Sequence, residues 1–237
     1  MTVEVLKSRK QMAEARAGMR RRRIDCASTF AERVLRKFGL LKGINVGDGT
    51  KSWDVYKTIR FIEEHVPKDI PVLDIGACEC EILPILHRIG YRDLTGIDLD
   101  ARIHEMPHAD AIRYLTGDFT RMECEDGSFG CVTAISVIEH GFDGQGLLAE
   151  LSRILRPGGH FIASVDYWPK KIDTAGIIAF GMDWRIFSEP ELRDFILDAK
   201  RFGFSPHGET DFTAEERTTT WKGKHYTFAW LVLRKDP

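Results

Sequence analysis

Acidic side chains stand at the ends of predicted buried strands, a pattern that suits recognition of a nucleoside. Residues 72–75 (VLDI) run into a short turn that contains Gly76, and residues 94–97 (LTGI) lead directly to Asp98. Asp98 follows Gly76 by 22 residues. In α/β folds, a glycine-bearing turn followed about 20 residues later by a carboxylate holds a nucleoside, because the carboxylate accepts the ribose hydroxyls. The spacing therefore predicts a nucleoside-containing ligand.

A histidine and an aspartate follow two later segments that are also predicted strands. His140 comes shortly after residues 130–136, and Asp166 comes directly after residues 160–165. Parallel strands end at one edge of a sheet, so both side chains are expected at the edge that carries Asp98. An imidazole can take the proton of a hydroxyl group, and a carboxylate can orient that imidazole. The alternative is that His140 only caps or packs against a neighbouring element.

Cys78 and Cys80 lie in the turn after Gly76 and raise the question of a metal or redox pair. A zinc site takes four protein ligands, or three and a water, and neither Cys124 nor Cys131 has a spacing that completes one. No metal site is therefore predicted. A nicotinamide cofactor is disfavoured because the chain lacks the phosphate-binding G-x-G-x-x-G turn. The five cysteines, odd in number and irregular in spacing, predict a reducing compartment, the cytoplasm.

The order of the predicted elements decides where these side chains lie. Helices are expected over residues 3–23, 29–38 (with Ser28 as N-cap) and 53–66. Strands are expected over residues 72–75, 94–97, 112–114, 130–136 and 160–165, with helices over residues 81–89, 145–155 and 189–202. Residues 156–159 form a Pro-Gly-Gly exit, 167–185 an irregular aromatic loop, and 205–212 with 226–234 a closing strand pair. This alternation predicts an α/β fold with a doubly wound, Rossmann-like, seven-stranded and mostly parallel sheet. The sheet should have an antiparallel closing strand, helices on both faces and an N-terminal helical extension.

Charge is unevenly distributed along the 237-residue chain. Residues 1–40 hold eleven Lys or Arg and four acidic residues, a net charge of +7, so the remainder must carry −9 to give the total of −2. The basic segment could contact an anionic group or simply be a solvated helix. No apolar run is long enough to cross a bilayer, and the first residues lack the apolar core of a secretory signal.

Several motifs together resemble a known family. VLDIGACECE, LTGIDLD, YLTGDFTRM, FGCVTAISVIEHG and ILRPGGHFIAS stand in the order and spacing of class I S-adenosylmethionine (SAM) dependent methyltransferases. The resemblance extends from about Trp53 to Arg234. Within the superfamily, the chain is similar to the small-molecule branch that includes sugar O-methyltransferases. It therefore divides the chain into a basic helical extension or lid, residues 1–50, and a SAM-dependent methyltransferase domain, residues 51–237.

The resemblance implies a role for each matched residue. The methionine part of SAM would contact Asp74, Gly76 and Ala77. The ribose would lie against Asp98 and Leu99, and the adenine against Asp118 and Phe119. Ser136 would lie near the sulfonium. His140 and Asp166 match an acid–base pair that some sugar O-methyltransferases use, and Tyr167 and Trp168 would contact the acceptor.

The turn departs from the family pattern, which usually has further glycines where this chain has Cys78 and Cys80. A Cβ restricts backbone that must approach a ligand, so the substitution bears on cofactor affinity. A second feature is an aromatic cluster after residue 166, which could form an acceptor pocket or a small separate core. Its members are Tyr167, Trp168, Phe180, Trp184 and Phe187.

The expected activity is metal-free methyl transfer from SAM, giving S-adenosylhomocysteine, to a small-molecule hydroxyl, on a sugar or glycoconjugate. Arg20–Arg23 leave open a nucleic-acid (RNA) methyltransferase, although no NPPY-like or DPPY-like motif follows residues 130–136. The altered turn leaves open a SAM-fold protein without enzymatic activity. Residues 1–50 could also make a homodimer contact.

Overall fold

The computed structural model describes residues 2–237. These residues form two compact units, one made of residues 2–11 with 120–237 and the other of residues 12–119. In the part of the chain that is described, no helix is long and apolar enough to span a bilayer. Each unit contains an α/β arrangement of the kind that the sequence predicts.

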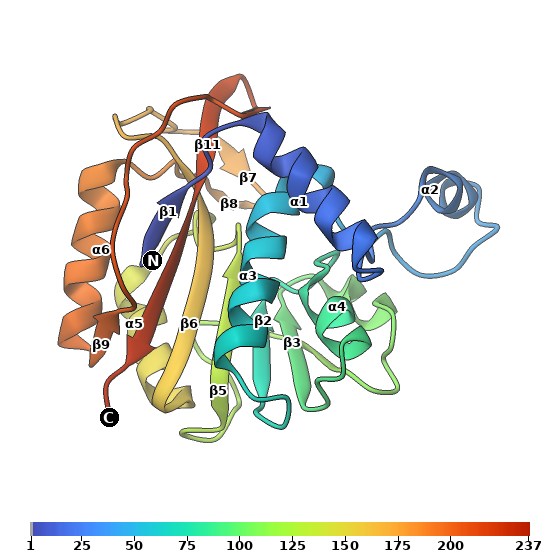
Figure 1. The fold of residues 1–237 in the computed structure, drawn as a ribbon, viewed down its shortest axis with the longest axis horizontal. Helices are drawn as coiled ribbons and strands as arrows, with labels where there is room; N and C mark the ends of the chain where they lie inside the picture. Colours follow the sequence, from blue (N-terminus) through green and yellow to red (C-terminus); the bar gives the residue numbers. More distant parts are fainter. Residues whose placement is uncertain (1) are drawn as a thin grey trace. The chain divides into compact units, whose positions relative to one another are not determined.

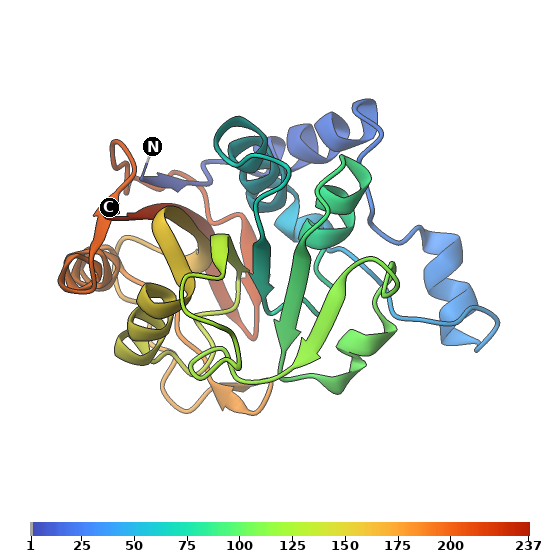
Figure 2. The same ribbon diagram turned by 90° about the horizontal axis from the view of Figure 1, so that it is seen from below.

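The unit of residues 12–119 is built on three parallel strands. They are β2 (Val72–Ile75), β3 (Leu94–Asp98) and β4 (Arg113–Thr116), and β3 pairs with both of the others. All four residues of β2 are buried, as expected for a strand covered on both faces. Helices α3 (Ser52–His65) and α4 (Ile82–Arg88) lie on one side of the strands (Figure 2). The unit of residues 12–119 also contains two short 3₁₀ helices, η1 (Gly49–Lys51) and η2 (Ala101–Glu105).

Two N-terminal helices belong to this unit, α1 (Arg9–Arg21) from residue 12 onward and α2 (Phe30–Lys37). α2 begins with a capping box in which Thr29 and Glu32 satisfy each other's backbone amides. The N-cap is therefore Thr29 and not Ser28, whose hydroxyl instead accepts from the Val46 amide. α2 buries none of its residues and stands away from α1 and α4 (Figures 1 and 2).

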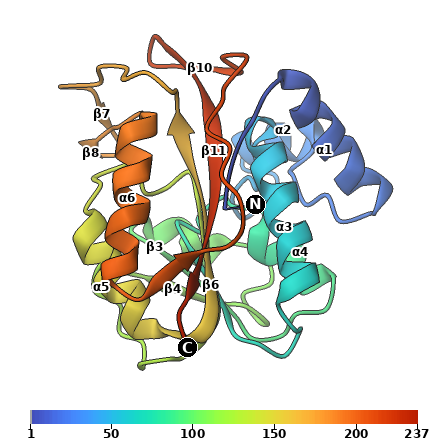
Figure 3. The same ribbon diagram turned by 60° about the vertical axis from the view of Figure 1, so that its left-hand side comes forward.

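The other unit contains the sheet β1–β11–β6–β5. Strands β5 (Phe129–Ile135) and β6 (Leu155–Tyr167) are parallel, and β11 (Lys224–Lys235) runs antiparallel to β6 and to β1 (Val3–Val5). Two short strands, β9 (Phe204–Pro206) and β10 (Thr219–Trp221), also pair antiparallel with β11. Helices α5 (Gly144–Ile154) and α6 (Glu189–Arg201) lie together beside β6 and β11 (Figure 3).

The structure confirms the alternating order and differs from the expected elements in five places. The expected helix over residues 3–23 is wrong at its start, because residues 3–5 pair with β11 and α1 begins only at Arg9. The Pro-Gly-Gly segment belongs to β6, whose register against β5 shifts between Phe129 and Cys131. The loop after β6 contains a small hairpin, β7 (Ile178–Ala179) and β8 (Met182–Asp183). The strand expected over residues 205–212 is shorter, and β10 was not expected at all.

Candidate active site

Asp98 ends β3 with its carboxylate held by the backbone. The Cys78 amide donates to Oδ2 at 3.0 Å, and the Asp100 amide donates to Oδ1 at 2.9 Å. A carboxylate has about four acceptor positions, so each oxygen can still accept a further hydrogen bond. Because Asp98 is partly exposed, hydroxyl donors can reach it. The side chain is therefore fixed in orientation and still able to bind a vicinal diol.

The turn between β2 and α4 packs against the end of β3. Gly76 adopts φ +70°, and the amides of Gly76 and Ala77 both donate to the Ile97 carbonyl, at 2.8 and 3.2 Å. The close approach depends on Gly96 in β3, where an added Cβ would lie 2.8 Å from the Ala77 Cβ. Gly96 was not among the predicted site residues, although a glycine inside a strand indicates close approach of backbone.

The cysteines of this turn do not strain its backbone. The turn residues with positive φ are Gly76 and Glu79, the latter at 64°, while Cys78 and Cys80 occupy ordinary conformations. Burial raises the pKa of the Cys78 thiol to about 12, with Asp98 adding to the effect, and burial raises the pKa of Cys80 as well. Both groups are therefore protonated thiols near neutral pH, and no metal-binding cluster occurs among residues 2–237.

The other predicted cofactor residues of this unit follow the strand ends. Asp74 is the third residue of β2 and is fully buried, and Ala77 is 1% exposed. Leu99 follows Asp98 with 54% of its surface exposed. At the end of β4, the Gly117 amide donates to the Asp98 carbonyl at 2.9 Å, so Asp118 and Phe119 leave the sheet next to Asp98. The seven residues expected at SAM thus lie at or just after the carboxyl ends of β2, β3 and β4.

The remaining predicted residues belong to the other unit. Ser136 directly follows β5 in a left-handed conformation, φ 53°, with its amide bonded to the Ser164 carbonyl. Strained backbone of this kind at a strand end is typical of functional sites. His140 is half-buried, and the rings of Phe180 and Trp221 lie edge-on to its imidazole at 5.1 and 6.1 Å.

Asp166 lies within β6 and binds an aromatic side chain. It is only 3% exposed, and its Oδ2 accepts a hydrogen bond from the Trp184 indole at 2.8 Å. Trp184 in turn packs edge-on against Trp221 at 4.9 Å, and its backbone pairs with that of His140. The carboxylate therefore orients the aromatic group that surrounds the histidine.

The five predicted aromatic residues separate into three environments. Phe180 and Trp184 lie in one cluster with His140, together with Trp221 and Tyr226, which were not among the predicted site residues. The hairpin signal around Lys222-Gly223 could have indicated Trp221. Tyr167 is fully buried with its hydroxyl on the Phe212 carbonyl at 2.8 Å, and Phe187 packs on Phe142. Trp168 lies under the guanidinium of Arg217.

Comparison with known proteins finds similarity over part of the chain. Residues 73–163 match a family model described as a methyltransferase domain. The match covers less than half of the chain, and it shows what this segment is similar to. The matched segment contains the glycine turn, β3 to β5 and the first half of β6, and therefore the carboxyl ends of β2, β3, β4 and β5.

Three known proteins illustrate the similarity. Sterol 24-C-methyltransferase erg-4 of Neurospora crassa is 29% identical over 104 residues, which are 40% of this chain and 27% of that protein. The human eEF1A lysine and N-terminal methyltransferase is 29% identical over 133 residues, 48% of this chain and 19% of that protein. The chain thus spans about a quarter or less of these relatives. Geranyl diphosphate C-methyltransferase of Streptomyces coelicolor A3(2), solved with S-adenosyl-L-homocysteine, has the same fold, with TM-score 0.58, 15% identity and coverage of 97% and 99%. The Rossmann-like fold class is therefore confirmed.

Proposed function

We propose that this protein transfers a methyl group from SAM to a small-molecule acceptor. The strongest support is the geometry of Asp98, whose two oxygens are already oriented by backbone amides and have acceptor capacity left for the two ribose hydroxyls. The match of residues 73–163 to a methyltransferase domain is independent support. When bound, SAM supplies a methyl group that its sulfonium has already activated.

The residues of this chain then have separate tasks. Asp98 accepts from the ribose with Leu99 beside it, and Asp118 accepts from the adenine amino group with Phe119 beside it. Gly76 and Ala77, with Asp74 behind them, form the wall against the methionine part, and Ser136 serves the same part of the cofactor. His140 takes the proton of the acceptor hydroxyl, which raises the nucleophilicity of its oxygen. Asp166 keeps the aromatic surroundings of His140 in place.

The first acceptor that we propose is a hydroxyl group on a sugar or glycoconjugate. The rings of Phe180, Trp184 and Trp221 beside His140 support it, since the C–H faces of sugars pack well on aromatic rings. An imidazole is a suitable group to take a hydroxyl proton. In this assignment the methylated product is an ether.

A second acceptor class is an isoprenoid carbon. Two of the proteins compared above carry C-methyltransferase names, for a sterol and for geranyl diphosphate. The same aromatic rings suit an apolar acceptor, and their π faces attract positive charge that develops on carbon during methylation of an alkene. In this assignment the alkene attacks the methyl group, His140 removes a proton from the resulting carbocation, and the product is a methyl-branched alkene.

The two classes are separated by the bond that the methyl group forms. The protein is incubated with ¹³C-methyl SAM and with a panel of sugar glycosides and isoprenoid diphosphates, and products are examined by carbon NMR. A labelled methoxyl signal supports the hydroxyl acceptor, and a labelled alkyl signal supports the carbon acceptor. If SAM binds but no panel member and no component of a metabolite extract takes up label, methyl transfer by this protein is contradicted.

We also propose that residues 1–50 act as a lid for the acceptor. α2 exposes large apolar side chains and buries none of its residues, which is unfavourable in water unless the helix covers something during turnover. The exposed apolar residues in and after α2 are Phe30, Leu35, Phe38, Leu40 and Leu41.

A further inference from the structure

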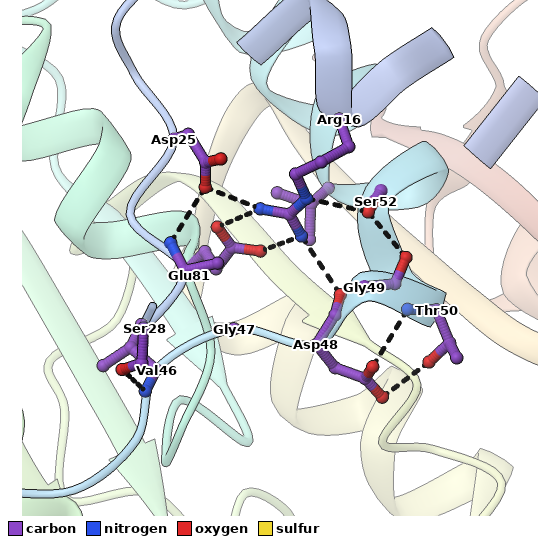
Figure 4. A network of polar contacts seen from close by, with 12 residues as sticks. Arg16, Asp25, Ser28, Val46, Gly47, Asp48, Gly49, Thr50, Ser52 and Glu81 are labelled. Carbon is purple, nitrogen blue, oxygen red and sulfur yellow. Dashed lines mark hydrogen bonds and ion pairs between the residues drawn. The ribbon is translucent and has the colours of Figure 1, made fainter. Parts of the chain in front are cut away.

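Arg16, on α1, is the centre of a buried polar network inside the unit of residues 12–119. Its side chain is only 10% exposed, yet each of its five N–H groups has an acceptor (Figure 4). The two terminal nitrogens bind both oxygens of Glu81, at 2.7 and 2.6 Å. The remaining donors bind Asp25 Oδ1 at 2.9 Å, the Ser52 hydroxyl at 2.9 Å and the Asp48 carbonyl at 3.1 Å.

Glu81 connects this network to the cofactor turn. It is the N-cap position of α4 and the last residue of the turn that begins at Gly76, and it is 1% exposed. The same turn contains Cys78, whose amide holds the Asp98 carboxylate. A paired, two-pronged contact from Arg16 therefore fixes the far end of the segment that orients Asp98.

The chain before α3 makes a second contact with the same turn. The Gly47 amide donates to the Glu79 carbonyl at 2.8 Å. Gly47 has φ +80°, and an added Cβ would lie 2.6 Å from the Glu81 Cδ, so the loop passes directly over that carboxylate. Ser28 joins this loop to the segment after α1, since its amide donates to the Val46 carbonyl at 2.7 Å. Residues 16–52 thus contact the turn at both Glu79 and Glu81.

The positive charge of Arg16 is compensated by the neighbouring carboxylates of Glu81 and Asp25. Burial by itself lowers the pKa of Arg16, but the hydrogen bonds and charges of Glu81 and Asp25 outweigh it and raise that pKa. Burial raises the pKa of Asp25, but its bonds to the Ala27 amide, Arg20 and Arg16 lower it overall. Removal of the guanidinium would leave the Glu81 carboxylate buried without its partner, so that the turn would have to move to solvate it.

We propose that Arg16 is a positioning residue for the cofactor, which acts by holding the Gly76–Glu81 turn through Glu81. This inference rests on the proposed function, since it assigns SAM to that turn. It also changes the role of the N-terminal segment, which becomes a structural part of the cofactor site in addition to a lid. Arg22 provides a matched control, because it directly follows α1 and pairs with Glu63 on α3, away from the turn.

The test compares Arg16→Lys and Arg16→Met with Arg22→Lys and Arg22→Met. SAM binding is measured by calorimetry, folding by thermal unfolding, and mobility of the free protein by amide hydrogen exchange. We expect Arg16→Met to raise the SAM dissociation constant at least about tenfold, with faster exchange at Cys78 and Gly47. The SAM dissociation constant of Arg16→Lys should lie between those of wild type and Arg16→Met, because an ammonium group keeps the charge but cannot reproduce the two-pronged contact of the planar guanidinium. The Arg22 variants should leave SAM affinity and these amides unchanged.

A folded Arg16→Met protein that binds SAM within about twofold of wild type and keeps its exchange pattern would overturn the inference. If Arg16→Met does not fold, the double variant Arg16→Met, Glu81→Leu removes both buried charges and provides the folded protein for the same measurements. Failure of wild type to bind SAM would reject the proposed function. The exchange measurement would still decide whether Arg16 holds the turn.

Discussion

At the residue scale, the side chains of Asp98 and His140 are held in place by different kinds of contact. Asp98 is oriented by two backbone amides, whereas His140 has the rings of Phe180 and Trp221 edge-on to its imidazole. Backbone contacts between neighbouring strand ends are local to the fold, so the position of Asp98 at a strand end beside the Gly76 turn could be predicted from the spacing of the two residues. Phe180 and Trp221 are 40 and 81 positions after His140, and no local pattern connects Trp221 to it.

His140 is expected to act on the acceptor and not on SAM. His140→Ala should lower kcat by roughly 10²–10⁴, the usual effect of losing a general base, while the SAM dissociation constant changes little. His140→Gln keeps the size and polarity of the side chain without its basicity and should be similarly slow. The measurement is steady-state kinetics with calorimetry. A folded His140→Ala protein whose kcat falls less than tenfold would make the histidine structural.

The cysteines are expected to be poor nucleophiles. Burial raises the pKa of Cys26 to about 11 and that of Cys78 to about 12, so at pH 8 their thiolate fractions are on the order of a hundredfold or more below that of a free cysteine. Alkylation by iodoacetamide, followed by peptide mass spectrometry, should be slow at both positions in the folded protein and fast in denaturant. Equal rates in the two states would restore the redox or metal interpretation of Cys78.

At the element scale, α2 shows most clearly what the sequence could and could not predict. Its helical pattern was visible, and its bounds agree with the expected residues 29–38 within one residue at each end. The start of α1 was not predicted, because three residues of alternating pattern are too few to indicate a strand. Residues 3–5 become β1 only because β11 offers them a backbone partner more than 200 positions later. Pairing over such a distance has no signal in local composition.

The lid proposal is tested on the exposed face of α2. Phe30→Ser with Phe38→Ser should raise the KM for the acceptor identified by labelled transfer several-fold, because these side chains are 83% and 70% exposed and carry no packing of their own. The melting temperature should stay within about 2 °C, as for surface substitutions. Leu197→Ser, a change at an exposed leucine on α6, is the control. An acceptor KM equal to that of wild type would leave α2 without a role in acceptor binding.

The basic segment is less available for anions than its composition suggests. Arg20 pairs with Asp25, Arg22 with Glu63, and Arg16 with Glu81 and Asp25. Arg21 and Arg23 are exposed and are the members of the Arg20–Arg23 cluster best placed to meet an anionic acceptor. Neutralising both to Gln should raise the acceptor KM at low salt and have less effect at high salt, since exposed charges are screened. A salt-sensitive shift of RNA in a gel would instead favour the nucleic-acid alternative.

At the scale of the whole molecule, the fold and the cofactor class follow from the sequence better than the acceptor does. Motif order along alternating strands and helices determines where the strand ends lie, and those ends contain the residues that we propose for the cofactor. Acceptor choice depends on how side chains from distant loops combine, as with Phe180, Trp184 and Trp221. The network of Arg16 was equally hidden, since its partner Glu81 is 65 positions away.

The most direct measurement is calorimetric titration of the protein with SAM, for wild type, Asp98→Ala and the control Asp93→Ala at the opposite end of β3. Wild type and Asp93→Ala should bind one SAM per chain with similar constants. Asp98→Ala should bind at least about thirtyfold more weakly, because the ribose hydroxyls lose a charged acceptor. An affinity in Asp98→Ala equal to that of wild type, or no binding of SAM by wild type, would contradict the assignment of this protein as a SAM-dependent methyltransferase that holds its cofactor at Asp98.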